Sequence, residues 1–158
     1  MANEGLVKTL AEEQNDRIQF VKIRLGTEWY GISIGIVENI VKMQRITRVP
    51  GAESYIKGVI NLRGKVVPVM SLRLKMDMDE GEVARATRII ILRIDGDEVG
   101  MIVDEVREVV TLSAEDIEEV YRDSKTANSG YVSGIGKMGN DLISLLDMYE
   151  VLGVKTAQ

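Results

Sequence analysis

The alternation of apolar and polar residues predicts β-hairpins at two places in the chain. Apolar and basic residues alternate across residues 21–25, a turn follows at Gly26, and the alternation resumes across residues 30–34. The same arrangement returns in "RIIILRI", residues 88–94, which is followed by "DGDE" and "VGMIV". A period of two is typical of half-buried strands, and Asp-Gly is a strong signal for a two-residue hairpin turn. Both regions are therefore predicted to be strand pairs.

Two further pairs of matching stretches indicate that the chain contains a repeat. "YIKGVINLRGKVVPVMSL", residues 55–72, aligns with "YVSGIGKMGNDLISLLDM", residues 131–148. Upstream, "YGISIGIVENIV" aligns with "VGMIVDEVREVV", which places Gly31 on Gly100. The distance in residues between the two copies is larger for the alignment of 55–72 with 131–148 than for the upstream alignment. The second copy therefore has extra residues, which fall in the polar stretch "YRDSKTANSG". We infer two copies of one unit.

The repeat sets the expected organisation of the chain. Gly64 is expected to turn a hairpin, and Pro68 then places the following strand at a sheet edge or delays its start, because proline donates no ladder hydrogen bond. Short strands at this spacing are typical of small barrels. A short terminal helix is expected to end at Gly153. We expect a tail at 1–16, a first barrel at 17–76, an acidic linker at 77–87 and a second barrel at 88–154.

Composition removes several classes of function. The 158 residues include no cysteine and no histidine, which excludes zinc sites built on thiolate or imidazole, cysteine nucleophiles and a histidine general base. A net charge of -5 and an aromatic share of 4% oppose binding to nucleic acid. No window approaches the roughly 20 apolar residues that span a bilayer. We expect a soluble, cytoplasmic protein that does not insert into a membrane.

Two stretches of the sequence are candidate sites. Residues 77–82, "DMDEGE", have the spacing of part of a calcium loop, but Arg88 stands where the twelfth ligand should be glutamate, so a solvated acidic linker is favoured. Arg63, at the tip of a predicted hairpin, is either a solvated turn residue or a recognition residue. The second copy has Gly139 at the equivalent position, so the turn does not need an arginine. This asymmetry favours recognition.

The segments around this hairpin resemble a known family. "YIKGVINLRGKVVPVMSLRLKM", with "YGISIGIVENI" upstream and "VGMIVDEVREVVTLS" downstream, is similar to the CheW chemotaxis coupling proteins, and the resemblance extends from Ile18 to Gly153. It implies an all-β fold with short helices, in which two five-stranded SH3-like barrels pack around a further hydrophobic core as one intertwined domain. It also implies a non-catalytic, cofactor-free adaptor. Such an adaptor joins the cytoplasmic tips of transmembrane chemoreceptors in signalling arrays to the regulatory domain of the histidine kinase CheA.

The resemblance also implies which residues contact partners. They are Val37, Glu38, Asn39, Lys57, Gly58 and Arg63. Arg63 matches the family's functional arginine, which is commonly paired with an acidic residue just before Ile40. Here that position is Asn39, and the acidic Glu38 comes one place earlier. Strand alternation would place Glu38 and Asn39 on opposite faces, so the partner of Arg63 is left open.

Other functions remain as alternatives to the adaptor. A fragment of CheA or of the adaptor CheV would carry the same kind of domain beside an ATP-binding or a receiver domain, and neither additional domain is expected in these 158 residues. A small barrel enzyme would instead need two carboxylates in one cleft whose pKa values are pushed apart, and the sequence shows no such motif. The adaptor is therefore preferred.

Overall fold

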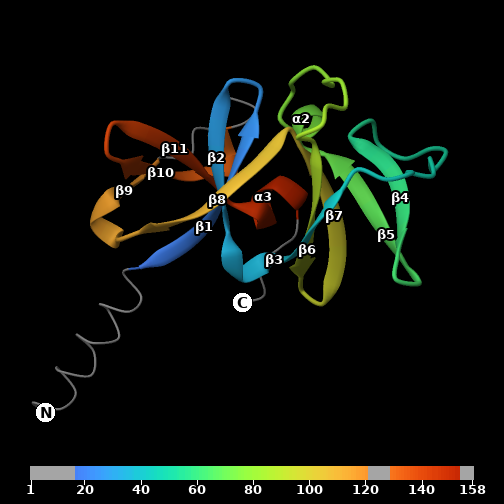
Figure 1. Ribbon diagram of the computed structural model, residues 1–158, viewed down its shortest axis with the longest axis horizontal. Coiled ribbons are helices and arrows are strands. Elements are labelled where there is room, and N and C mark those ends of the chain that lie inside the picture. The colour runs from blue at the N-terminus through green and yellow to red at the C-terminus, as the bar shows by residue number, and fades with distance from the viewer. Residues whose placement is uncertain (1–16, 121–128, 154–158) are drawn as a thin grey trace, which may run out of the picture.

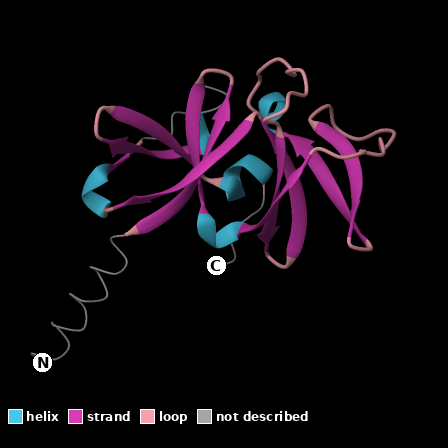
Figure 2. Cartoon of the chain, in the orientation of Figure 1, coloured by secondary structure: helices cyan, strands magenta, loops and turns pink. Residues whose placement is uncertain are grey.

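Two β-sheets make up the described chain, which comprises residues 17–120 and 129–153 of a computed structural model (Figure 1, Figure 2). The first sheet has six strands, in the order β8 (Glu105–Leu112), β1 (Ile18–Leu25), β2 (Glu28–Ser33), β11 (Asp141–Leu146), β10 (Val132–Met138) and β9 (Ile117–Glu119). The second has five, in the order β3 (Val37–Lys42), β6 (Arg88–Ile94), β7 (Asp97–Val103), β5 (Lys65–Ser71) and β4 (Ile56–Leu62). The helices are α2 (Leu72–Lys75), α3 (Met148–Leu152) and the 3-10 turns η1 (Ile34–Ile36), η2 (Ala114–Asp116) and η3 (Ser129–Tyr131). The expected all-β fold with short helices and two SH3-like units is confirmed, although one sheet has a sixth strand.

Each sheet combines strands from both repeats. The hairpin β1–β2 of the first repeat lies between β8 and β11 of the second, and the hairpin β6–β7 of the second lies between β3 and β5 of the first. We expected residues 17–76 and 88–154 to form one barrel each; instead, both ranges are divided between the two sheets. The reason is that β2 and β7 extend their sheets by parallel pairing with β11 and β5 of the other repeat. We call this arrangement the hairpin exchange.

The register of the strands confirms the repeat. Gly31 lies opposite Leu145 in the parallel pair β2–β11. Gly100 lies opposite Val69 in the parallel pair β5–β7. These are equivalent positions in the two sequence alignments, so the repeat inferred from the sequence corresponds to equivalent backbone pairing.

The predicted turns and the unusual proline are explained by local geometry. Asp95 and Gly96 have φ angles of 52° and 84°, so both central residues of the β6–β7 turn are left-handed, as a type I′ turn requires. Pro68 pairs with Val59 of β4, and β5 meets β7 only from Val69 onward. The strand itself begins at Lys65 and lies between β4 and β7, so the prediction of an edge strand or a late start is wrong for β5 as a whole. Proline is tolerated because it lies where the second neighbouring strand has not yet joined.

A short backbone contact joins one edge strand of the five-stranded sheet, β4, to the segment that follows the other edge strand, β3. Thr47, in the segment after β3, exchanges two backbone hydrogen bonds of 2.8 Å with Val59 of β4. In the other sheet the equivalent contact is the strand β9, which pairs with β10. A single bridge in one unit and a three-residue strand in the other account for the difference between five and six strands. We call the two units the five-stranded and the six-stranded barrel.

The hydrophobic core has a shared part and two smaller parts. The shared part is contributed by both sheets, α2 and α3 and contains Val21, Ile23, Leu25, Ile32, Met70, Leu72, Met76, Ile90, Leu92, Ile94, Met101, Val103, Leu146, Met148 and Val151. Smaller clusters fill the interior of each barrel. This agrees with the expected pair of barrels around a further core. In Figure 1, α3 lies between the two barrels, and it ends at Gly153 with a φ of 68°, as the sequence predicted.

Asp104 joins the two barrels at the point where the chain passes from β7 to β8. Its carboxylate accepts hydrogen bonds from Arg73 of α2, at 2.8 and 2.5 Å, and from the backbone N–H of Gly26, at 2.8 Å. Arg24 of β1 lies 3.7 Å from the same carboxylate. Burial by itself would raise the pKa of Asp104, but the hydrogen bonds from Arg73 and Gly26 outweigh it, and the pKa is lowered. One side chain thus connects both repeats.

Candidate functional site

Arg63 occupies the turn between β4 and β5 and is exposed. Its φ is 53° and that of Gly64 is 83°, and the turn is held by Asn61, whose side-chain oxygen accepts a 3.0 Å hydrogen bond from Gly64 N–H. A positive φ at a residue other than glycine is uncommon, so the turn presents Arg63 in a specified backbone conformation. Within residues 17–120 and 129–153, no carboxylate lies within ion-pair distance of its guanidinium. Arg63 can therefore donate to a group from outside the chain.

A recess of about 210 Å³ lies beside this turn. It is lined by Glu38, Asn39, Leu62, Arg63, Lys65, Arg93 and Glu98. The pairing of β3 with β6 shifts register between Val37 and Asn39, which leaves Glu38 as an extra residue. Such a bulge interrupts strict alternation. The prediction that Glu38 and Asn39 lie on opposite faces is therefore wrong with respect to this recess, because both line it.

The acidic partner in the recess belongs to Arg93. Arg93 donates to Glu38 from Nε at 2.9 Å and from Nη2 at 2.5 Å. Glu98 lies 3.6 Å from Arg93 and 3.3 Å from Lys65. The hydrogen bond from Arg93, followed by one shared with Glu98, lowers the pKa of Glu38. Among the residues lining the recess, both carboxylates are thus engaged by Arg93 and Lys65, and Arg63 is left as the unneutralised cation.

Lys57 and Gly58 lie at the other end of β4. Gly58 has a φ of 143° and follows a register shift in the pairing of β4 with β5. A Cβ atom at Gly58 would overlap the carbonyl oxygen of Thr47, the residue that bridges to β4. Only glycine fits here, and the feature is a bulge in a strand. Gly58 therefore shapes the strand that presents Lys57.

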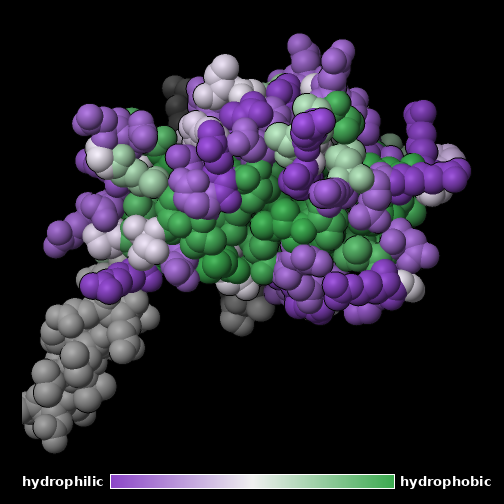
Figure 3. Space-filling view, in the orientation of Figure 1, coloured by the Kyte–Doolittle hydropathy of each residue, from purple (hydrophilic) through white to green (hydrophobic). Residues whose placement is uncertain are grey.

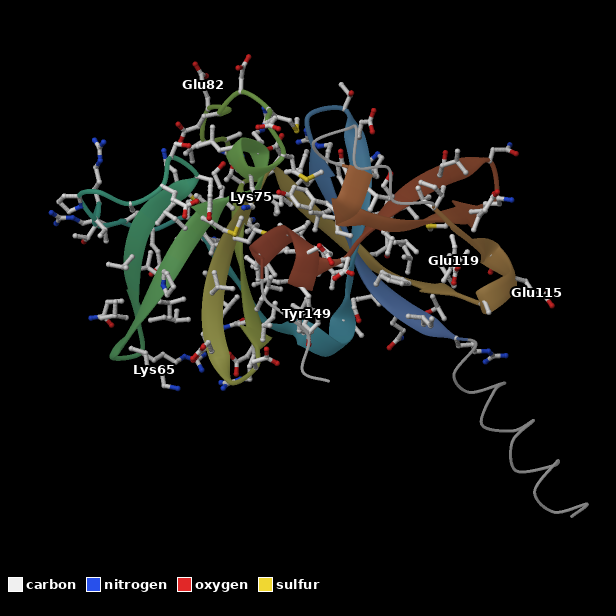
Figure 4. All side chains as sticks on the ribbon, turned by 180° about the vertical axis from the view of Figure 1, so that it is seen from behind. Lys65, Lys75, Glu82, Glu115, Glu119 and Tyr149 are labelled. Atoms are coloured by element: carbon white, nitrogen blue, oxygen red, sulfur yellow. The ribbon has the colours of Figure 1, made fainter. Side chains whose placement is uncertain are left out.

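Lys57 is held by the linker between the repeats. Its ammonium group forms an ion pair with Glu80, and the two side chains are 30% and 49% exposed. The linker, expected to be simply solvated, is also anchored by Arg73, which donates to the carbonyl oxygen of Asp79 at 3.1 Å. We call residues 77–87 the acidic strap. Figure 4 shows Glu82 of the strap and Lys65 beside the Arg63 turn at opposite ends of the five-stranded barrel.

Val37 lies in an apolar part of the surface. It is half-buried against the shared core at the start of β3. Two nearby residues, Ile34 and Ile40, are each 39% exposed. Figure 3 shows apolar residues gathered across the centre of the face on which α3 and β3 lie, with hydrophilic residues around them. Val37 is thus part of an apolar edge.

The structure gathers three of the six expected site residues around one recess and adds residues that the sequence did not single out. Arg93 and Glu98 are cross-strand neighbours in the hairpin β6–β7. Their pairing could have been found from the Asp-Gly turn alone, because the turn fixes which residues lie opposite each other. Arg93 also stands out as a charge that interrupts the apolar run of β6 after residues 89–92.

The recess is lined mainly by charged side chains. A general acid would need a raised pKa, whereas the pKa of Glu38 is lowered by its partners. In the described part of the chain, no group of three or more acidic side chains is arranged to hold a metal ion. The described helices include none that is long and apolar enough to cross a membrane. An exposed guanidinium beside satisfied carboxylates suits recognition of an anionic group.

Comparison with known proteins places the chain in a family. The sequence profile of the CheW-like domain matches residues 19–155. The chain is 41% identical over 129 residues to a chemotaxis protein CheW of Bacillus subtilis, covering 82% of this chain and 83% of that protein. It is 34% identical over 152 residues to a CheW of Klebsiella aerogenes, covering 96% and 91%. The crystal structure of the scaffolding protein TtCheW from Thermoanaerobacter tengcongensis superimposes with a TM-score of 0.78 at 32% identity, covering 85% of this chain and 91% of that one. The chain therefore belongs to the CheW family of chemotaxis proteins.

Proposed function

We propose that this protein is a non-catalytic adaptor that couples the cytoplasmic tips of chemoreceptors to the regulatory domain of the histidine kinase CheA. The observation that carries the proposal is the match to the CheW-like domain across residues 19–155, and it is supported by the exposed Arg63, which the resemblance matches to the family's functional arginine. In this role the protein works in the cytoplasm, within membrane-bound receptor arrays, and supports receptor control of the kinase.

The partner-binding residues in this proposal are Val37, Glu38, Asn39, Lys57, Gly58 and Arg63. Arg63 binds a carboxylate of the partner, because its planar guanidinium can donate two parallel hydrogen bonds and is not engaged by a described carboxylate. Glu38 holds Arg93 in place. Val37 supplies apolar contact, and desolvated apolar anchors usually contribute more to affinity than charges at the rim.

The two ends of the five-stranded barrel provide separate surfaces for this adaptor. The Arg63 recess lies at one end and Lys57 lies toward the other, beneath the acidic strap. An adaptor must hold receptor and kinase at the same time, and two surfaces permit that. A competition experiment tests this: a receptor-tip fragment and the kinase domain are titrated together, and mutual displacement at one site would contradict the arrangement.

A reconstituted kinase assay tests the proposed function itself. Arg63→Glu is expected to abolish receptor-dependent control of the kinase while the protein remains folded. Arg17→Glu is the matched control, because Arg17 is also exposed and lies outside the recess. If the wild-type protein binds neither partner, or if both variants couple normally, the proposal is wrong.

A further inference from the structure

The acidic strap is fixed firmly at its base. Arg73 is held by two hydrogen bonds to Asp104, at 2.8 and 2.5 Å. Its guanidinium also lies against Gly81, where an added Cβ would meet it at 2.8 Å. The backbone N–H of Met78 donates to the carbonyl of Arg73 at 2.8 Å. The path of the strap over the end of the barrel is therefore set by Arg73.

The strap covers a cavity of about 220 Å³ at the end of the five-stranded barrel, and both apolar and charged side chains line it. The floor of this cavity includes Met43, Ile46 and Ile102, which pack against the barrel's own core. Lys57 lines the same cavity. An apolar floor beside a lysine is the composition of a docking surface for a segment that carries one carboxylate and one apolar side chain.

The strap itself has that composition. Glu80 contributes the carboxylate that engages Lys57, and Val83 contributes an apolar side chain that lines the cavity yet is 65% exposed. Both side chains of the Lys57–Glu80 pair are substantially exposed, and such pairs are weak because water screens them. The contact made by Glu80 can therefore be replaced by an equivalent contact from outside at little cost.

We propose that the acidic strap is a built-in competitor: through Glu80 it occupies Lys57 in place of an acidic segment of a docking partner, which must displace it to bind. This inference rests on the proposed function, because it adds an internal competitor to one of the surfaces of the adaptor. The partner segment carries a carboxylate for Lys57 and an apolar side chain for the cavity. The strap thereby lowers the affinity of the adaptor for that partner.

The affinity test uses variants of the strap in the full chain. Glu80→Gln removes the competing charge and is expected to tighten binding of the partner that carries the acidic segment by about two- to fivefold, the range of an exposed ion pair. Asp77→Asn is the matched control, because it removes the same charge from the same strap, Asp77 does not line the cavity and no described cation pairs with it. The kinase regulatory domain and a receptor-tip fragment are titrated separately by calorimetry, which identifies the partner.

A double mutant and a labelling experiment test whether Glu80 acts through Lys57. In a Lys57→Gln background, Glu80→Gln is expected to have no effect on affinity. Tightening that persists there, or equal affinities for Glu80→Gln and Asp77→Asn, would overturn the proposal. The second measurement needs no partner: Lys57 is labelled with an amine-reactive ester and quantified by mass spectrometry. Faster labelling of Lys57 in Glu80→Gln than in Asp77→Asn supports the competitor, and equal rates contradict it. If wild type binds neither partner, the adaptor function fails while labelling still tests the strap.

Discussion

Replacing Asp104 by asparagine should destabilise the whole molecule, because this carboxylate connects elements of both repeats. The change keeps the size of the side chain and an acceptor for Gly26, but removes the charge that Arg73 and Arg24 face. Hydrogen bonds to a charged group contribute about 1.5–3 kcal/mol each. The side chains of Arg73 and Asp104 are only 24% and 17% exposed, so water replaces the lost interactions in part. We expect a net loss of about 2 kcal/mol.

Thermal unfolding followed by circular dichroism measures this loss. For a chain of this size 1 kcal/mol corresponds to about 2–4 °C, so Tm should fall by about 4–8 °C at neutral pH. Asp97→Asn is the control, since Asp97 is exposed at the start of β7 and pairs with no described cation. If both variants melt within about 1 °C of wild type, the connecting role of Asp104 is refuted.

The pH dependence gives an independent check on Asp104. Its pKa is lowered in the folded protein, so its contribution to stability is complete above the ordinary value of 3.8 and is lost as the pH falls through the folded value. The difference in stability between wild type and Asp104→Asn should therefore shrink as the pH is lowered from about 7 to about 3. A constant difference across this range would show that the charge of Asp104 is not responsible.

Three other results are expected. Arg63→Glu should change the free energy of unfolding by less than about 0.5 kcal/mol, as for other exposed residues. In thermal melts, the effects of Arg63→Glu and Asn39→Ala should add in the double mutant, and strong non-additivity would show that Arg63 has a structural role. Gly58→Ala should cost more than about 3 kcal/mol or prevent folding, whereas Gly64→Ala, with open space around it, should cost about 1–2 kcal/mol in denaturant titrations. Trp29 fluorescence, which reports the six-stranded barrel, should change in one transition with circular dichroism, because each barrel is built from strands of both repeats; separate transitions would contradict this.

The local features of the fold were predictable from the sequence because each depends on a few neighbouring residues. The turn at Asp95 and Gly96 and the end of α3 at Gly153 follow from glycine's access to a positive φ. The repeat was visible because equivalent core positions carry similar side chains. Arg63 was identified through the family resemblance and through its difference from Gly139, and the structure places it beside the recess.

The remaining features depend on contacts between distant parts of the chain. Alternation shows that β2 is a strand but not that it pairs with β11, and the hairpin exchange follows from that pairing. The bulge at Glu38 is a property of two strands together, so a one-strand pattern placed Glu38 and Asn39 on opposite faces. The strap was expected to be solvated because its own sequence offers acidic side chains without a basic partner among them. The lysine that engages Glu80 comes from the distant strand β4.

The hairpin exchange gives this single chain the connectivity of a swapped dimer whose subunits are tied together. Each repeat alone would leave its first hairpin without a sheet, and each supplies the strands that the other lacks. The covalent link at residues 77–87 then contributes mainly a high effective concentration of one half for the other. A cut there would leave two fragments able to complete each other's sheets. The segment then acts chiefly as a tether between two interlocked halves, and its exposed acidic residues can serve regulation.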